Sequence, residues 1–319
     1  GSNDPKDSYK ALSWHVVFAA VLSSVWALVQ LRGDLAPYPL SDGRPYAGLG
    51  STVYLASFLA LAFPIALERR LHWQASLILL GIVLTETRAA LIAAAVGGLV
   101  IIYGRYHPRR WHKIAILIGF IGMAGLMTHN RTDILKADKG RLVVYKTAGR
   151  IIKDNPWLGY GPDLFLNAFL KYRDKEWTAA GFSEQSSQGT AHNDILQAMA
   201  SGGIFWTLAY VFLCLTIGGW LIIARQGGML ASALALFTYA KLNETAFPVK
   251  IVFFILLGAA LKELRGRISG SILPKIATGS ILAMTFWLLL QDRYLYWARV
   301  LGSKTIMDMA QTFSNIYGG

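Results

Sequence analysis

The stretch that decides the fold is LILLGIVLTETRAALIAAAVGGLVII, at residues 77–102. Two apolar runs flank the polar turn Thr85-Glu86-Thr87-Arg88. A helix needs about 20 apolar residues to cross a hydrocarbon core, and each run is short for that. One broken helix, a re-entrant hairpin and two tilted spans all satisfy these lengths. We interpret the stretch and its flanks as two spans, Trp73 to Leu84 and Ala89 to Gly104.

The composition of the whole chain agrees with a membrane protein. Hydrophobic residues make up 54% of the chain and charged residues 15%, and the mean hydropathy is +0.42. Soluble domains carry about 25% charged residues. The net charge of +13 comes from Lys and Arg in short connectors, where such residues orient helices in a membrane. We therefore expect membrane lipids, and no nucleic acid, as partners. Cys214 stands alone, which excludes an internal disulfide and a CxxC site.

Further apolar segments predict more spans on both sides of this stretch, and residues 129–192 form the large polar segment. The further candidate spans are Ala11–Leu31, Leu49–Leu67, Lys113–Thr128, Ile195–Ile223, Met229–Tyr239, Val249–Leu261 and Ser271–Leu290. The sequence thus predicts an all-α, polytopic transmembrane helical bundle with N-terminal spans (1–128), a loop containing short amphipathic helices (129–192), C-terminal spans (193–291) and a tail (292–319). The chain begins at Gly1 without Met, so we expect upstream spans to be missing.

Positive charge sets the expected orientation, because Lys and Arg are retained on the cytoplasmic side of short loops. If the first helix runs from inside to outside, the cytoplasmic connectors hold about twice as many of these residues as the outer ones. The cytoplasmic set is Arg69, Arg70, Arg105, Arg109, Arg110, Lys113, Arg225, Lys262, Arg265 and Arg267, and the outer set is Arg32, Arg44, Arg88, Lys241 and Lys250. This orientation places the Arg88 turn, the 129–192 loop and His192 in one outer compartment.

Arg88 is the first candidate for chemistry. An ionised side chain between two apolar runs is expensive and is usually paired or functional. The alternatives are an Arg that snorkels at a helix end and an Arg neutralised by Glu86.

A second group of basic residues lies in GRLVVYKTAGRIIKDNP, at residues 140–156. Lys146, Arg150 and Lys153 recur at spacings of four and three, with apolar residues on the other side. This pattern predicts an amphipathic helix with a basic face that ends at Asn155-Pro156. The simplest explanation is a surface helix on anionic lipid. A sharper hypothesis places Arg141, at the entrance of the helix, beside a phosphate in a cleft.

The third candidate is His192, directly before an apolar span. Asn193 or Asp194 could cap that helix. An imidazole with a pKa near neutral can accept a proton from an acceptor hydroxyl. A structural His at a membrane interface is the alternative. Gly159 and Gly161 lack the third Gly or the GK[ST] of a phosphate loop, so they predict a turn.

Several motifs of metal-dependent or hydrolytic chemistry are missing from the sequence. It has no HExxH, no Cys/His cluster and no GxSxG, and the outer loop has no closely spaced DxD. We therefore expect no metal and no cofactor. Arg side chains would neutralise a pyrophosphate through forked hydrogen bonds, while the His activates the acceptor.

The motifs resemble, in their order, those of the O-antigen ligase and O-antigen polymerase (Wzy-C-like) superfamily of bacterial membrane glycosyltransferases, and most of all O-antigen ligase. The resemblance rests on TETRAAL at 85–91, GRLVVYKTAGRIIKDNPWLGYGPDLF at 140–165 and AHNDILQAMASGGI at 191–204, with RPYAGLGSTVYLASFLALAFPIAL upstream at 44–67. The sequence departs from the family in three respects. Glu86 and Thr87 replace the expected residues before Arg88, Ala89 stands where Gly is common, and the spans are fewer.

The resemblance implies a GT-C-like fold and a metal-independent, inverting transfer of a glycan from a polyprenyl pyrophosphate, such as undecaprenyl pyrophosphate. The reaction would take place at the periplasmic face of the bacterial inner (cytoplasmic) membrane. By motif matching, Arg88 and Arg141 would bind the pyrophosphate, and His192 would orient or deprotonate the acceptor. Further candidates for substrate binding are Tyr145, Arg150 and Asn193.

The acceptor stays open at this point. It is lipid A-core for a ligase of lipopolysaccharide biosynthesis, a second lipid-linked glycan for a polymerase, and a Ser or Thr for a protein O-oligosaccharyltransferase. The modest loop favours the ligase. A transporter of the lipid-linked glycan and a structural scaffold are the alternatives from other classes of protein.

Overall fold

The computed structural model describes residues 5–32, 43–106, 119, 122, 134–161, 164–183, 188–223, 226–243 and 245–262. Over these residues the protein is about 80% helical and has no strand, which confirms the all-α prediction. The elements are α1 (Pro5–Leu31), α2 (Thr52–Glu68), α3 (His72–Leu84), α4 (Arg88–Ile101), the π-helical turn η1 (Ile102–Tyr106), α6 (Ile134–Asp154), α7 (Phe165–Tyr172), α8 (Glu176–Ala179), α9 (Asp194–Ile223), α10 (Gly227–Leu242) and α11 (Phe247–Lys262).

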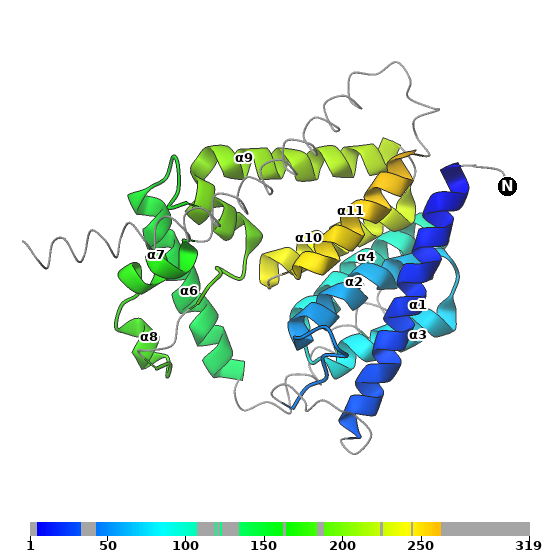
Figure 1. Cartoon of the computed structure of the whole chain (residues 1–319), viewed down its shortest axis with the longest axis horizontal. Coiled ribbons are helices and arrows are strands. Elements are labelled where there is room, and N and C mark those ends of the chain that lie inside the picture. Colours follow the sequence, from blue (N-terminus) through cyan, green and yellow to red (C-terminus); the bar gives the residue numbers. More distant parts are fainter. Residues whose placement is uncertain are drawn as a thin grey trace, which may run out of the picture.

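Helices α1–α4, α10 and α11 pack into one bundle (Figure 1), which we call the apolar bundle. Its central helix, α2, contacts α1, α3, α4 and α10. Small residues allow these helices to approach closely. A Cβ added to Gly97 on α4 would lie 2.9 Å from the carbonyl oxygen of Ala231 on α10. Such close backbone contacts through small residues are typical of helix packing in membranes.

Among the helices that the structure describes, two are long and apolar enough to cross a membrane, Ser8–Leu31 within α1 and Asp194–Ile223, which is α9. Many of their large apolar side chains lie on the surface, with exposed fractions of 63% for Phe18, 56% for Phe212 and 69% for Leu215. The core helix of a soluble protein would bury such side chains. The exposed apolar surface therefore agrees with a membrane environment.

The stretch at residues 77–102 forms two separate helices and not one broken helix. Thr85–Thr87 separates α3 from α4, and Glu86 has a left-handed φ of 49°. Both helices pack on α2, but their second partners differ, because α3 also contacts α1 whereas α4 also contacts α10. Helices lie at the other predicted spans that the structure describes. The predicted spans 113–128 and 271–290 lie outside the described residues, apart from Gly119 and Gly122.

Helices α6, α7 and α8 form a second unit beside the apolar bundle (Figure 1), which we call the aromatic unit. The ring of Trp177 stacks on Phe182 with centroids 4.2 Å apart and meets the ring of Phe169 edge to face at 5.2 Å. Val144 and Ala148 present the apolar face of α6 to this core. The predicted amphipathic helix is thus confirmed. Its apolar face is buried in protein, which argues against a helix that lies free on anionic lipid.

The aromatic unit is joined to α9 at a kink. Three backbone hydrogen bonds make the joint: Tyr160 N to Ala200 O (2.7 Å), Gly161 N to Ser201 O (2.9 Å) and Ile204 N to Pro156 O (2.9 Å). Gly203 lies at the kink with φ 68° and ψ −164°, and a Cβ there would overlap the carbonyl oxygen of Trp157. Gly159 and Gly161, both with positive φ, form the predicted turn. The turn docks on α9.

Candidate functional site

A cavity of about 310 Å³ lies where the apolar bundle meets the aromatic unit. It is lined by Arg44, Val53, Glu86, Thr87, Arg88, Gly140, Arg141, Val144, Trp177, Phe182, Gln188, His192 and Asn243. This volume falls within the range of small-molecule sites, about 300–1,000 Å³. The three predicted catalytic residues, Arg88, Arg141 and His192, come from distant parts of the sequence, and the structure brings them to this one cavity.

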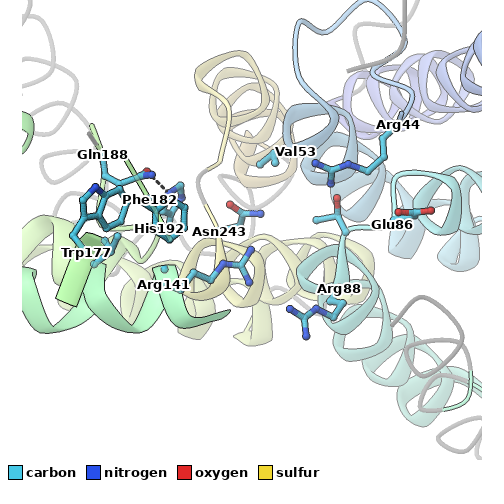
Figure 2. Close-up of a pocket in the computed structure, with 13 residues that line it drawn as sticks. Arg44, Val53, Glu86, Arg88, Arg141, Trp177, Phe182, Gln188, His192 and Asn243 are labelled. Atoms are coloured by element: carbon cyan, nitrogen blue, oxygen red, sulfur yellow. Dashed lines mark hydrogen bonds between the residues drawn. The ribbon is translucent and has the colours of Figure 1, made fainter. Parts of the chain in front are cut away.

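Arg88 begins α4 at the end of a hydrogen-bonded turn. The Thr85 hydroxyl donates to the Ile82 carbonyl (2.7 Å) and accepts from the Thr87 N–H (3.3 Å). Thr87 Oγ1 donates to the Thr85 carbonyl at 3.2 Å. Figure 2 shows the Arg88 guanidinium pointing toward the middle of the cavity and the Glu86 carboxylate pointing away from it. The turn thus directs a cation into the space where an anion could bind.

Arg141 approaches the same space from the aromatic unit (Figure 2). The prediction that it lies at the helix entrance is wrong, since α6 begins at Ile134. Gly140 does not start the helix but lies within it, where the ring of Phe182 packs over it. A Cβ on Gly140 would lie 2.5 Å from the ring atom Cζ. Close packing, and not a helix boundary, therefore explains this glycine.

His192 lies two residues before α9 and has a left-handed φ of 50°. Its Nε2 is 3.0 Å from Oε1 of Gln188 (Figure 2). Because an amide oxygen only accepts hydrogen bonds, this assignment puts the imidazole proton on Nε2 and the lone pair on Nδ1. Within the described part of the chain, Nδ1 is buried and has no hydrogen-bond partner. Burial lowers the pKa of His192 and the charge of Arg141 lowers it further, so the imidazole is neutral at pH 7.

Asn193 has a supporting role. Its Oδ1 accepts from the backbone N–H groups of Ile195 (3.0 Å) and Leu196 (3.2 Å), which makes it the N-cap of α9 as predicted. Its Nδ2 donates to the carbonyl of Lys241 at the end of α10 (2.9 Å). The side chain therefore fixes the segment that carries His192, and it does not line the cavity as a substrate-binding residue would.

Tyr145 and Arg150, the other predicted substrate-binding residues, do not line the cavity either. Arg150 follows Arg141 by nine residues, which places the two on opposite sides of a helix. Its guanidinium pairs with Asp174 at 2.5 Å and also donates to the carbonyl of Tyr172. Arg150 thus ties α6 to the end of α7, on the side of the helix opposite to Arg141 and the cavity.

Arg44 lines the cavity and was not among the predicted site residues. Its guanidinium points toward the same space as those of Arg88 and Arg141 (Figure 2). The one signal in the sequence was its place at the start of the upstream segment, residues 44–67, that resembles the family. A single Arg in a polar connector is otherwise indistinguishable from a residue that only sets membrane orientation.

The family comparison covers most of this site. Residues 73–211 match the family model described as O-antigen ligase. Comparison with curated proteins found no match. The matched range includes Arg88, Arg141 and His192, while Arg44 lies outside it. This stretch is therefore similar to the O-antigen ligase family, a family of membrane proteins, as the order of the motifs predicts.

Proposed function

We propose that this protein transfers a glycan from a polyprenyl-pyrophosphate donor to an acceptor hydroxyl, in an inverting reaction that needs no metal ion. The observation that carries the proposal is the convergence of Arg88, Arg141 and His192 on one cavity. Guanidinium groups match the charge and the forked geometry of a pyrophosphate. A buried, neutral imidazole suits the proton of an attacking hydroxyl.

In the proposed mechanism, Arg88 and Arg141 hold the pyrophosphate from opposite sides of the cavity. The acceptor oxygen attacks the anomeric carbon while the bond from that carbon to the phosphate oxygen breaks. The proton of the acceptor hydroxyl passes to Nδ1 of His192, and the bonding electron pair leaves with the pyrophosphate. Attack from the face opposite the leaving group inverts the anomeric configuration. The two guanidinium groups are positioned where negative charge develops in the transition state.

We infer that the acceptor is lipid A-core, which makes the reaction O-antigen ligation in lipopolysaccharide biosynthesis. The description of the matching family supports the ligase over the polymerase and the protein O-oligosaccharyltransferase. The excess of Lys and Arg in the connectors assigned to the cytoplasm supports a periplasmic site in a multi-pass, GT-C-like protein of the inner membrane. The exposed apolar side chains of α1 and α9 support the same placement.

The test is glycan transfer by the purified protein, supplied with an undecaprenyl-pyrophosphate glycan and lipid A-core. For His192→Ala we expect the rate to fall by about 10²–10⁴-fold, because the general base is lost. For Arg141→Ala we expect the rate to fall by about 10²–10³-fold, because one hydrogen-bond donor to the developing charge is lost. Lys153→Ala, on an exposed position of the same helix, is the matched control and should transfer at the wild-type rate.

Two outcomes would overturn the proposal. If both His192→Ala and Arg141→Ala transfer glycan at the wild-type rate, these residues do not carry the chemistry. If the wild-type protein moves the donor across a vesicle membrane and leaves its glycosidic bond to pyrophosphate intact, the protein is a transporter.

A further inference from the structure

The cavity collects more positive charge than the two predicted arginines supply. Arg44 comes from the connector before α2, Arg88 from the start of α4 and Arg141 from the middle of α6. All three guanidinium groups point toward the same space (Figure 2). Because three separate elements contribute them, their convergence is a property of the fold and not of one basic segment.

The connector that carries Arg44 is held firmly in place. The side-chain oxygen of Gln30, which is 1% exposed, accepts hydrogen bonds from the backbone N–H groups of Tyr46 (3.0 Å) and Ala47 (2.7 Å). At the start of α2, the carbonyl of Val53 accepts from the buried Tyr239 hydroxyl at 2.7 Å. These bonds attach the connector to α1 and the start of α2 to α10. Arg44 is therefore pre-positioned, which strengthens electrostatic stabilisation of a reacting group.

The charge on the pyrophosphate changes during the proposed reaction. In the donor, each of the two phosphates is esterified on one side and carries one negative charge. When the bond to the sugar breaks, its electron pair stays on the terminal phosphate, which then keeps only its anhydride bond and carries a second charge near neutral pH. The pyrophosphate thus passes from two negative charges to three. Two guanidinium groups match the donor, and a third matches the charge that appears as the bond breaks.

We propose that Arg44 binds the leaving pyrophosphate and stabilises this third charge, which makes it a further catalytic residue of the site. The assignment rests on the proposed function, because it needs a pyrophosphate leaving group in this cavity. Arg88 and Arg141 hold the donor from the start and also face the developing charge, whereas Arg44 is assigned to the additional charge that appears as the bond breaks. An interaction stronger in the transition state than in the bound substrate raises kcat more than it lowers KM. Loss of Arg44 should accordingly show in kcat.

The experiment compares wild type with Arg44→Gln and Arg44→Lys and measures both binding and transfer. The binding probes are farnesyl pyrophosphate, which carries the third charge, and its glucose diester, which lacks it. For Arg44→Gln we expect binding of farnesyl pyrophosphate to weaken by about 10-fold or more, and binding of the diester to change by less than about threefold. In transfer, we expect kcat to fall by about 10²-fold with little change in KM.

Two variants serve as controls. Arg44→Lys keeps the positive charge but loses the bidentate hydrogen bonding of the guanidinium group. Relative to Arg44→Gln, it should therefore recover part of the affinity for farnesyl pyrophosphate and part of kcat. It also shows that the connector tolerates substitution. Arg32→Gln removes an equal charge at the exposed end of α1, away from the cavity lining, and should behave as wild type.

The possible failures are distinguishable. If wild type transfers glycan and Arg44→Gln binds the two probes and transfers as wild type does, the assignment of Arg44 is wrong and the proposed function stands. If Arg44→Gln weakens the binding of both probes equally, Arg44 is a donor-binding residue without a special role in the bond-breaking step. If the wild-type protein binds neither probe and transfers no glycan, the proposed function and the assignment of Arg44 both fall.

Discussion

The apolar bundle and the aromatic unit differ in what they bury and in what they expose. The apolar bundle buries mainly Ala, Leu and Ile side chains, while helices such as α1 leave large apolar side chains on the surface. The aromatic unit packs large rings such as Phe169 and Trp177 inside and carries exposed ion pairs, for example Lys146 with Glu176. The first composition fits lipid as a surrounding solvent and the second fits water. The buried and exposed side chains of the two regions are thus suited to different solvents.

The cavity lies at the contact between these regions, and neither of them makes it alone. The apolar bundle contributes Arg44 and Arg88, and the aromatic unit with the segment before α9 contributes Arg141 and His192. Helix α9 contacts both regions (Figure 1). Activity should therefore depend on how α9 and its kink align the two sets of residues.

The largest effect is expected from a change that separates the two regions. In Gly203→Ala, the new Cβ would overlap the carbonyl oxygen of Trp157, and alanine would also have to adopt the glycine-only backbone of the kink. We expect a loss of about 3 kcal/mol of stability or more, together with loss of glycan transfer. Thermal unfolding in detergent and the transfer assay measure the two effects.

Gly218→Ala is the matched control, because it lies on the same helix and a Cβ there meets no atom of the described residues within 4 Å. It should leave stability and transfer near wild type. If Gly203→Ala proves as stable and active as Gly218→Ala, the joint at the kink does not align the site.

An intermediate effect is expected within the site, at the partner of His192. Gln188→Met removes the acceptor that fixes the imidazole proton on Nε2. A buried hydrogen bond contributes about 1 kcal/mol, so we expect kcat/KM to fall by about fivefold. Gln188→Glu keeps an acceptor, and its charge stabilises the imidazolium form.

The two variants should therefore differ in their pH profiles. In wild type the pKa of His192 is lowered by burial and by Arg141, so activity should persist below pH ~6.5 and decline only as the imidazole becomes protonated. Gln188→Glu raises that pKa, so its activity should begin to decline at a higher pH. Identical pH profiles for wild type, Gln188→Met and Gln188→Glu would show that His192 does not take the proton.

The sequence predicted most of the helices because apolar length alone marks a segment that must be buried in lipid or protein. It also predicted that Arg88, Arg141 and His192 share a site, since the order of three motifs pointed to one family. Arg44 was missed because its position depends on Gln30, and a hydrogen bond between these distant segments leaves no local pattern.

Other errors arose from treating spacing along the chain as if it gave direction in space. Arg150 shares a basic helix with Arg141 but faces the other side of it. Arg141 was predicted at the entrance of the helix, although α6 begins at Ile134 and Arg141 lies within it. Asn193 is next to His192 in sequence, yet its amide is used by the cap of α9 and by the end of α10. Each of these depends on tertiary contacts.

The smallest effect is expected at Arg150. Its ion pair with Asp174 is exposed by more than a third on each side chain, so it should contribute less than about 1 kcal/mol. We expect Arg150→Ala to lower the thermal midpoint slightly and to leave the transfer rate within about threefold of wild type. A loss of transfer as large as that of Arg141→Ala would restore Arg150 as a substrate-binding residue and would contradict its placement outside the cavity.

The most direct test of the central claim is the stoichiometry of the reaction catalysed by the purified wild-type protein. With an undecaprenyl-pyrophosphate glycan and lipid A-core as substrates, we predict one undecaprenyl pyrophosphate released for each glycan that becomes attached to the acceptor. Chromatography with mass detection measures both products. If glycan is not attached to the acceptor, or if the donor is recovered intact after exposure to the protein, the cavity between the two regions is not a glycosyl-transfer site.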